Sequence, residues 1–483
     1  MVAAWVARWV EPGGESMAMG RRNGESQGTL WVATGELPRS PGHVFYVKLN
    51  ALLADAGFDE WVEALCQPYY AEKRGRPGIP PGVYFRMLFV GYFEGIGSQR
   101  GIAWRCADSL SLRTFLGMAA DEESPDHSSL TIIRNRLSKD VHTDIFQWVL
   151  TLAREKHVLN GKTLGVDSTT LEANAAMKSI VRKDSGDDWR AYLTKLMQEE
   201  GVLAADETPT IDELVQFDKR RKKRGEKKVS NEDWVSETDP SARIAKMKDG
   251  TTHLAYKAEH AVDLETEMIV AAEIYHADET DTVTLEDTVN TAQIHLHESG
   301  SDVQVTDVVA DKGYHANEVL ETFAEDTPYR TYLPEPKLPA GRKHVWTNKP
   351  EVQHQAYTNN RRRTQGDRGK RLQRQRSEQV ERTFAHVCET GGARRTWLRG
   401  IENVRKRSLI AAVAHNLGRL MRALFGMGTP RGLQKEGAAL SAALRAWQHA
   451  PTTRWSPWPT VNRLLSPMTS IFRMPGIPAP TAA

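Results

Sequence analysis

The sequence predicts an α/β protein in which a mixed sheet with flanking helices follows an all-α segment. Three observations support this fold class. Five short, β-favouring apolar segments alternate with helical segments between residues 161 and 425. Between residues 43 and 160, in contrast, the apolar residues recur at the spacing of amphipathic helices. With 483 residues, 40% of them hydrophobic, the chain is long enough to bury a large core.

The composition narrows the class of protein. A formal net charge of +2 is too small to indicate a nucleic-acid partner by itself, so evidence for such a partner depends on where the basic residues cluster. The cysteines Cys66, Cys106 and Cys388 lie far apart and form no zinc or disulfide pattern, which indicates a reducing compartment. No secretory pattern and no uncharged stretch of membrane-spanning length is present. We therefore expect a cytoplasmic protein with no membrane segment.

Shifts in composition predict the domain organisation. We expect a disordered tail over residues 1–42, which are rich in Gly, Ser and Pro, and a helical domain over residues 43–160. An α/β domain follows over residues 161–425, with a polar insertion at about residues 179–250 that contains two helices and a run of basic residues. Residues 426–483, rich in Pro, Ala and Trp, should form a second tail.

The helical domain carries clear capping signals. A basic loop with Arg74 and Arg76 leads into a helix that starts near Pro81 and should end at Gly95. Ser98 is expected to cap a second helix.

A third helix, after Asp126, carries Arg134 and Arg136. Short helices joined by glycine turns, with arginines on their free faces, suit a helix-turn-helix-like DNA-binding module. An all-helical packing domain with solvated arginines is the alternative, and the residue pattern alone leaves both open.

The first candidate site residue of the α/β domain is Asp167, which follows the β-favouring run Leu164–Val166. The second is Asp311, at the end of the run Val305–Ala310 and just before a turn at Gly313. Carboxylates at the ends of strands offer the oxygen ligands that hard divalent cations prefer. Taken alone, an Asp after a strand is more often a turn or cap residue.

The third candidate is Glu381, on a helix where Val380, Phe384 and Val387 recur on one face. Because Glu381 borders this apolar stripe, we expect it to face the sheet. Two competitors lie nearby: Glu378 has polar neighbours, and Glu389 lies where the helix should already be ending. Two strand-borne Asp and one helix-borne Glu can share two Mg²⁺ ions and support an in-line phosphoryl displacement.

A strongly basic stretch, residues 335–375, precedes this helix and is expected to be a polar loop beside the candidate site. Together with the helix it supplies five arginines as candidate DNA contacts: Arg361, Arg362, Arg363, Arg376 and Arg382. A solvated basic loop without a DNA partner is the competing interpretation.

Three motifs in this order, VDSTTLEANA, ADKGYHA and VERTFAH, resemble the catalytic signatures of bacterial insertion-sequence transposases of the DDE type. The run RGRPGIPPGVYFRMLFVGYFEGIGSQRGIAWR looks like the N-terminal domain of the same families. The resemblance extends from about Phe45 to about Arg431. It implies an RNase H-like catalytic domain and an N-terminal domain that binds the ends of the element. Cys388 departs from it, since the family often has a Lys at that place.

The resemblance also implies a function. Asp167, Asp311 and Glu381 would be the catalytic residues and would hold two Mg²⁺ or Mn²⁺ ions. The enzyme would cleave a phosphodiester bond at the element's end and transfer the freed strand to target DNA. Its partner would be double-stranded DNA, bound by a homodimer in the nucleoid. Two alternatives remain open at this point: a metal-dependent nuclease of the same fold, and a catalytically inactive DNA-binding repressor.

Overall fold

The computed structural model describes most of the chain between residues 42 and 430. The described ranges are 42–71, 78–119, 121–204, 207–224, 231–247, 250–336, 350–392 and 394–430, without the side chains of 221–224 and 389–390. The two predicted tails therefore lie outside the described residues, apart from Gly42 and residues 426–430, and so do Arg74 and Arg76.

The first described segment is all-helical, as predicted. Its helices are α1 (Val44–Asp55), α2 (Phe58–Cys66), α3 (Pro81–Glu94), α4 (Gln99–Asp108), α5 (Leu110–Phe115), α6 (His127–Arg136) and α7 (Lys139–Glu155). The capping signals are confirmed. Gly95 ends α3 in the left-handed conformation with φ 73°, and the Ser98 side chain accepts a hydrogen bond from the Gly101 amide at 3.1 Å. Asp126 caps α6 through the amide of Ser129.

A mixed sheet follows the helices and confirms the predicted fold class. Its strands are β1 (Thr163–Glu172), β4 (Arg243–Lys246), β5 (Thr252–Asp263), β6 (Ile269–His276), β7 (Asp307–Val309) and β8 (Arg330–Tyr332). The order β6-β5-β1-β7-β8, antiparallel as far as β1 and parallel from there, is that of an RNase H-like sheet. Strand β4 pairs with the beginning of β5.

Strand β1 is longer than the sequence suggested. Asp167 lies in its middle and not at its end, because β5 is long enough to pair with β1 as far as Glu172. Strand β7 pairs with β1 only as far as Gly165. On the β7 side, Asp167 therefore lies just past the last strand pairing.

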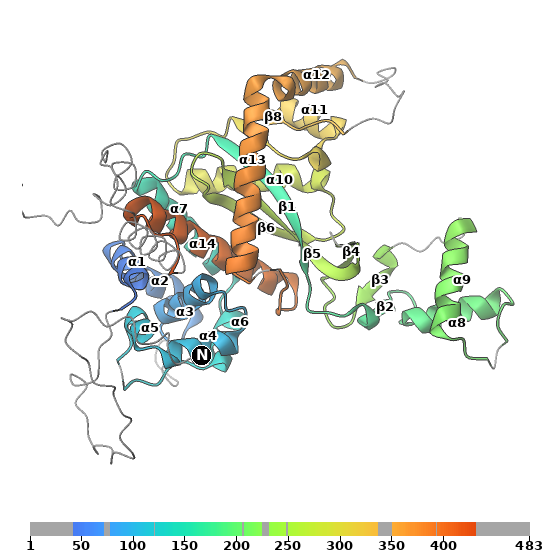
Figure 1. The fold of residues 1–483 in the computed structure, drawn as a ribbon, viewed down its shortest axis with the longest axis horizontal. Helices are drawn as coiled ribbons and strands as arrows, with labels where there is room; N and C mark the ends of the chain where they lie inside the picture. Colours follow the sequence, from blue (N-terminus) through green and yellow to red (C-terminus); the bar gives the residue numbers. More distant parts are fainter. Residues whose placement is uncertain are drawn as a thin grey trace, which may run out of the picture. The chain divides into compact units, whose positions relative to one another are not determined.

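The two faces of the sheet are covered by different helices. Leu164 and Val166 of β1 belong to the cluster that packs under α10 (Asp281–Glu298). Gly165, between them, faces α13 (Asp367–Ala385), which crosses the strands in Figure 1. A Cβ at Gly165 would lie 2.9 Å from a methyl group of Val380, so only glycine allows α13 to come this close.

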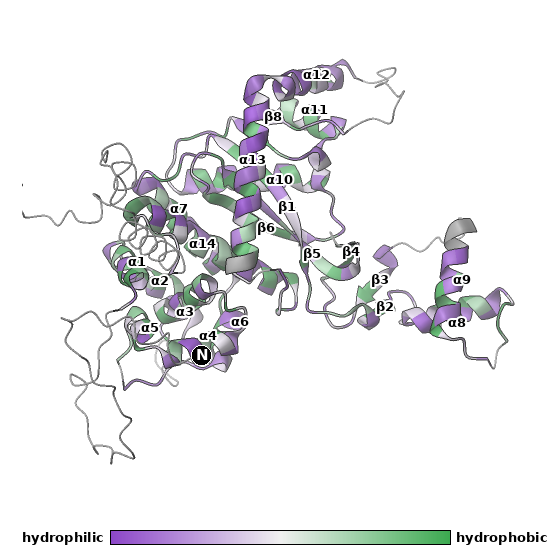
Figure 2. Cartoon of the chain, viewed as in Figure 1, coloured by the Kyte–Doolittle hydropathy of each residue, from purple (hydrophilic) through white to green (hydrophobic). Residues whose placement is uncertain are grey.

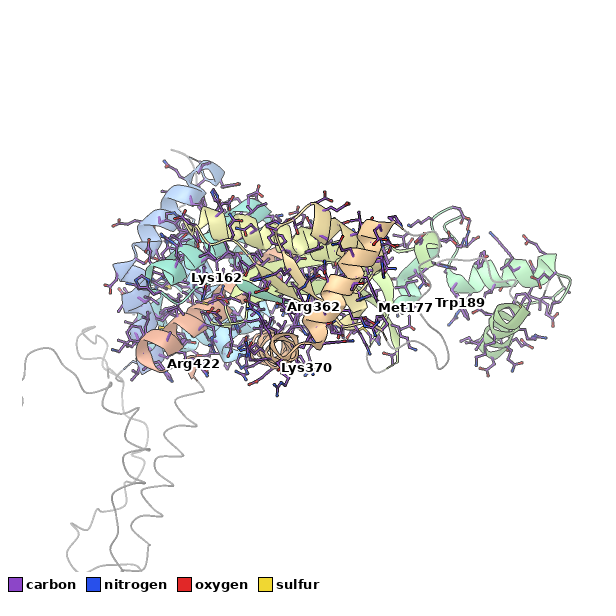
Figure 3. All side chains as sticks on the ribbon, turned by 90° about the horizontal axis from the view of Figure 1, so that it is seen from above. Lys162, Met177, Trp189, Arg362, Lys370 and Arg422 are labelled. Atoms are coloured by element: carbon purple, nitrogen blue, oxygen red, sulfur yellow. The ribbon has the colours of Figure 1, made fainter. Side chains whose placement is uncertain are left out.

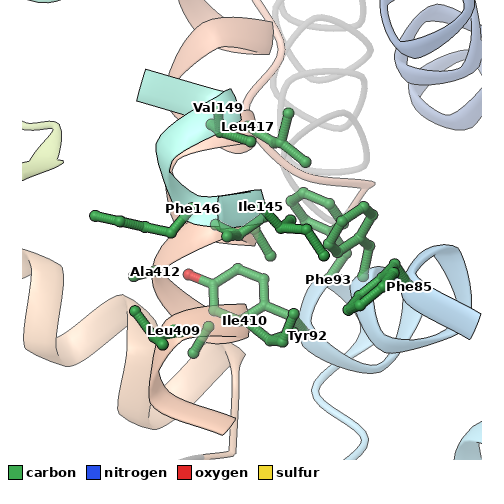
Figure 4. Close-up of a cluster of buried hydrophobic side chains, with 14 of the residues drawn as sticks. Phe85, Tyr92, Phe93, Ile145, Phe146, Val149, Leu409, Ile410, Ala412 and Leu417 are labelled. Carbon is green, nitrogen blue, oxygen red and sulfur yellow. The ribbon is translucent and has the colours of Figure 1, made fainter. Parts of the chain in front are cut away.

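The helix α14 (Ile401–Phe425) joins the two parts of the core. It packs on β6, α7 and α3 within one hydrophobic cluster. Figure 4 shows Leu409, Ile410 and Leu417 of α14 beside Phe146 of α7 and Tyr92 of α3. The all-helical segment and the sheet are thus held together through α14.

The insertion forms two helices, as predicted, and a small sheet. Its elements are β2 (Ile180–Arg182), α8 (Trp189–Glu199), α9 (Ile211–Arg224) and β3 (Trp234–Ser236). Strands β2 and β3 pair with each other. A separate small cluster joins the helices: Leu193, Met197, Leu214 and Phe217.

The prediction of a loop over residues 335–375 is wrong for its second half. After α11 (Asn317–Glu325), the chain forms α12 (Glu351–Gln365) and then α13. Among the buried residues of α12 are Gln353 and Asn360, so the inward face carries no continuous apolar stripe. Figure 2 shows how hydrophilic both helices are. Asn360 is satisfied inside by exchanging two hydrogen bonds, of 3.0 and 2.8 Å, with the backbone of Leu333.

A buried side chain fastens α14 to the sheet and gives a test of this fold. Asn416 is fully buried, accepts a hydrogen bond from the Ile269 amide at 2.9 Å and donates one to the Ile269 carbonyl at 2.8 Å. We predict that Asn416→Ala lowers the free energy of unfolding by roughly 2 to 4 kcal/mol, because two buried backbone groups lose their partners. Urea titration measures the loss. Asn403→Ala, on the exposed side of the same helix, should cost far less, and equal losses would contradict the prediction.

Candidate active site

Asp167 and Asp311, predicted from separate motifs, lie on neighbouring segments and share one cation. Asp311 follows β7 and precedes a short 3₁₀ turn at Lys312–Tyr314. The Arg376 guanidinium reaches both carboxylates from α13: its Nη1 lies 2.9 Å from Asp167 Oδ2, and its Nη2 lies 3.9 Å from Asp311 Oδ1. The two negative charges therefore converge on one point above the sheet.

The cation of these ion pairs is more deeply buried than its two carboxylate partners. The Arg376 side chain is only 8% exposed, whereas the side chains of Asp167 and Asp311 are 23% and 49% exposed. A buried guanidinium is costly unless carboxylates or other acceptors surround it. The Nε of Arg376 has no hydrogen-bond partner among the described residues. The guanidinium of Arg376 therefore contacts Asp167 and Asp311 through its two Nη atoms alone.

Glu381 does not face the sheet, contrary to the prediction. The buried positions of α13 near it are Arg376, Val380 and Thr383, whereas Glu381 is exposed and accepts a hydrogen bond from Ser377 at 3.0 Å. Val380 is buried as expected. One step along a helix turns the side chain by roughly 100°, however, so the neighbour of a buried residue points elsewhere.

The two competing glutamates are placed differently. Glu378 is 70% exposed and forms an ion pair with Arg382, which also contacts Glu267 at 2.9 Å. The side chain of Glu389 lies outside the described residues. Within the described part of the chain, no three His, Cys, Asp or Glu side chains stand close enough to hold a metal ion together. The geometry thus brings two of the three candidates together.

A buried polar network lies directly behind the two aspartates, and sequence reasoning missed it. Glu259 of β5 is completely buried and accepts hydrogen bonds from Thr284, Thr288 and Tyr314 at 2.9, 2.6 and 2.9 Å. Burial raises the pKa of this carboxyl, while its charged neighbour Lys257 opposes the shift. Tyr314 closes the 3₁₀ turn that starts after Asp311.

Lys257 extends the network to the strand that carries Asp167. Its ammonium lies 3.2 Å from Glu259 and 2.7 Å from Asp281, the first residue of α10. Asp281 in turn accepts a hydrogen bond from Ser168 at 3.0 Å. The signal in the sequence was the pair Lys257 and Glu259, two charged residues on one face of the strand with the apolar residues Ala255 and Ala261 on either side.

The predicted DNA-contacting arginines of α12 and α13 have different environments. Arg363 donates to the Thr331 carbonyl at 3.0 Å, and Arg361 lies 3.5 Å from Glu335. Arg362 is exposed, and so is Lys370 on α13; both are labelled in Figure 3. Arg371 and Arg374 of α13 are exposed as well. The outer side of α12 and α13 is therefore basic.

The two predicted arginines of α6 also differ. Arg136 is exposed, and its guanidinium lies 4.7 Å from the ring centroid of Tyr70. Arg134 instead lines a cavity against α14, where its carbonyl accepts a hydrogen bond from Lys406 at 3.2 Å. Only Arg136 of this pair lies on an open surface.

In comparisons with known proteins, two family models match separate parts of the chain. The model described as Transposase domain (DUF772) matches residues 36–136, and the model described as Transposase DDE domain matches residues 336–421. Arg376 and Glu381 lie in the second match, while Asp167 and Asp311 lie between the two. No curated protein and no solved structure matches the chain. None of the described helices is long and apolar enough to cross a membrane.

A buried histidine beside the aspartates gives a prediction of pH dependence. His260 pairs with Asp167 across β5 and β1, stacks on Phe384 with ring centroids 4.2 Å apart, and is held by burial at a pKa of about 3. In the unfolded chain the His260 imidazole binds a proton below about pH 6.5, whereas in the folded chain it stays neutral until the pH is far lower. The free energy of unfolding therefore falls as the pH falls.

The free energy of unfolding of the unmodified protein should fall between pH 7 and pH 5. We predict that in His260→Phe this fall is smaller by about 2 kcal/mol, because the variant lacks the histidine that titrates. Urea midpoints at the two pH values measure this loss for each protein. The same substitution at the exposed His297 controls for the removal of an imidazole. A pH dependence equal to that of the unmodified protein would contradict the prediction.

Proposed function

We propose that this chain is an active DNA transposase that binds the ends of an insertion sequence, cleaves a phosphodiester bond there and transfers the freed strand to target DNA. Both family matches are to transposases and confirm the resemblance to insertion-sequence transposases of the DDE type. The observation that carries the proposal is the convergence of Asp167 and Asp311 on the buried guanidinium of Arg376.

Carboxylates are the correct class of ligand for the divalent metal ions that DDE transposases generally use. In our proposal Asp167, Asp311 and Glu381 hold two Mg²⁺ or Mn²⁺ ions. Bound ions of this kind polarise phosphoryl oxygens and lower the pKa of water. Arg376 orients the two aspartates and supplies a charge-assisted donor for a phosphate oxygen. The network of Lys257 and Glu259 supports the aspartates from behind.

Glu381 is the best remaining candidate for the third carboxylate. Glu378 forms an ion pair with Arg382, whereas among the described residues Glu381 accepts a hydrogen bond only from the Ser377 hydroxyl. Glu381 lies roughly 140° around the helix from Arg376, given a turn of 3.6 residues. To join the aspartates, its side chain must therefore swing around the helix or α13 must rotate when DNA binds.

We assign DNA binding to the basic outer side of α12 and α13 and to the N-terminal helices. Arg362 lies exposed on the first surface, and Arg136 on the second. Arg74 and Arg76, in the loop before α3, are further candidates by sequence. Phosphate contacts of this kind release counterions, so binding should weaken steeply with salt. A homodimer in the active complex and a location in the nucleoid complete the proposal.

A catalytically inactive DNA-binding protein is the second candidate, and one observation favours it. Glu381 is exposed and does not join Asp167 and Asp311 in a three-carboxylate cluster among the described residues. A nuclease without strand transfer is a third. Incubation with a labelled element end and a target plasmid separates the three: joined products indicate a transposase, cut products alone a nuclease, and bound but uncut DNA an inactive binder.

The first functional prediction concerns the aspartates. Asp167→Asn or Asp311→Asn should lower strand cleavage at least about a thousandfold in Mg²⁺, because each change removes a ligand charge without removing volume. Binding of the element end, measured by gel shift, should remain. Asp326→Asn, on an exposed residue after α11, is the matched control. Cleavage at the unmodified rate by either variant would show that these aspartates are structural.

The second functional prediction chooses between two glutamates of α13. Glu381→Gln should be inactive in Mg²⁺, because the third metal ligand is lost. Glu378→Gln should keep most of the activity, since it removes only an exposed ion pair with Arg382, worth about 0.5 kcal/mol. Single-turnover cleavage of a labelled element end measures both. The opposite ranking would place the ligand one turn earlier on the helix.

A further inference from the structure

A cavity of about 310 Å³ lies between the N-terminal helices and α14, away from the two aspartates. Its walls come from α3, the start of α4, α6, α7, α14 and the segment before α14. Much of the lining is aromatic or aliphatic: Tyr84, Leu88, Tyr92, Ile96, Trp397 and Ile410. The volume falls within the range of small-molecule sites.

One corner of this cavity is positively charged. The lining includes the cations Arg134 of α6 and Lys406 and Arg407 of α14, beside the imidazole of His142 of α7. Lys406 is 8% exposed, and its ammonium donates to the carbonyl of Arg134 at 3.2 Å. The Nε of Arg134 is buried and has no hydrogen-bond partner among the described residues. Burial lowers the pKa of Arg134 and of Lys406. Burial, together with the positive charges of these two residues, holds the pKa of His142 at about 4.

Among the described residues, no acidic side chain lines the cavity, so these charges have no carboxylate partner there. Glu402 lies one turn before Lys406 on α14, where it raises the pKa of Lys406, but it is exposed and not part of the lining. Buried cations are expensive unless an anion compensates them. The described residues do not supply that anion, and an anionic ligand would.

The mouth of the cavity is connected to the strand that carries Asp167. Trp397 is 56% exposed, and its carbonyl accepts a hydrogen bond from Asn174 at 2.9 Å. Next to it, the Thr396 amide donates to the carbonyl of Glu172, the last residue of β1, at 2.9 Å. Glu172 lies five positions after Asp167 along the strand, a path of roughly 16 Å. In duplex DNA, about five nucleotides of one strand span the same length.

We propose that this cavity binds one nucleotide of an unpaired DNA strand, with its phosphate at Arg134 and Lys406 and its base between the aromatic walls. Stacking on aromatic side chains together with cationic backbone contacts is how proteins hold single strands. Inorganic phosphate would leave the apolar walls empty, and a neutral aromatic molecule would leave the cations uncompensated. The identification of DNA as the source rests on the proposed function.

The first test uses the full-length protein and the mononucleotide dAMP. Calorimetric titration should show binding of dAMP at least about tenfold tighter than binding of deoxyadenosine or inorganic phosphate, because only dAMP fills both parts of the site. Arg134→Gln and Lys406→Gln should each weaken dAMP at least about tenfold, through loss of a charge-assisted hydrogen bond. Arg422→Gln, at an exposed residue of α14 outside the lining, should leave the affinity unchanged.

Thermal melting of each variant checks that it is folded. If Lys406→Gln is unstable, Lys406→Arg tests the same position, and it should retain dAMP binding because it keeps the charge. No binding of dAMP, equal binding of dAMP and phosphate, or equal affinity in all variants would overturn the site.

The second test separates the two sources of the nucleotide. Arg134→Gln and Lys406→Gln should weaken a single-stranded oligonucleotide more than a fully paired duplex of the same length. Loss of dAMP binding with no change for the single strand would assign the cavity to a free nucleotide and overturn the DNA assignment.

The same titrations on the Asp167→Asn protein need neither metal nor cleavage. Failure of the proposed catalytic function therefore leaves this result intact, and the two hypotheses fail separately.

Discussion

The contact between Arg376 and the two aspartates fixes the geometry on which the proposed activity depends. A guanidinium that is 8% exposed must keep its acceptors, so α13 cannot slide along the sheet without leaving a buried charge unpaired. The same contact draws Asp167 and Asp311 towards one point, although the chain separates them by the insertion, a hairpin and α10. One charged side chain thus sets both the position of a helix and the spacing of two acids.

Close packing and hydrogen bonds to the backbone of the sheet also fix the position of α13. Val380 fits against Gly165, where any Cβ would collide with it, and Gln373 donates to the carbonyls of Ala310 and Tyr332 at 3.1 and 2.6 Å. These contacts hold the helix over β1, β7 and the end of β8. They also determine that Glu381 points away from the sheet, because its place on the helix follows from the buried positions. Any movement that brings Glu381 to the aspartates must loosen at least one of these contacts.

The sequence predicted those features whose signals are local. Caps at Ser98 and Asp126 were found because such side chains bond their own helix. The helix α12 was missed because its buried face contains Gln353 and Asn360, whose partners come from distant segments. The orientation of Glu381 was missed for a related reason. Arg376 is a charged residue at a buried position, so an apolar stripe alone could not define the inward face.

The formal charges of the proposed site indicate when each metal ion binds relative to the DNA. Asp167, Asp311 and Glu381 with Arg376 carry a net charge of −2, which one divalent ion neutralises. A second divalent ion would leave an excess of +2 in a partly buried site, and such an excess is unfavourable unless anions approach. Two phosphates of a DNA strand supply that compensation. On this argument the first ion binds to the protein alone, whereas the second enters together with the strand that is to be cut.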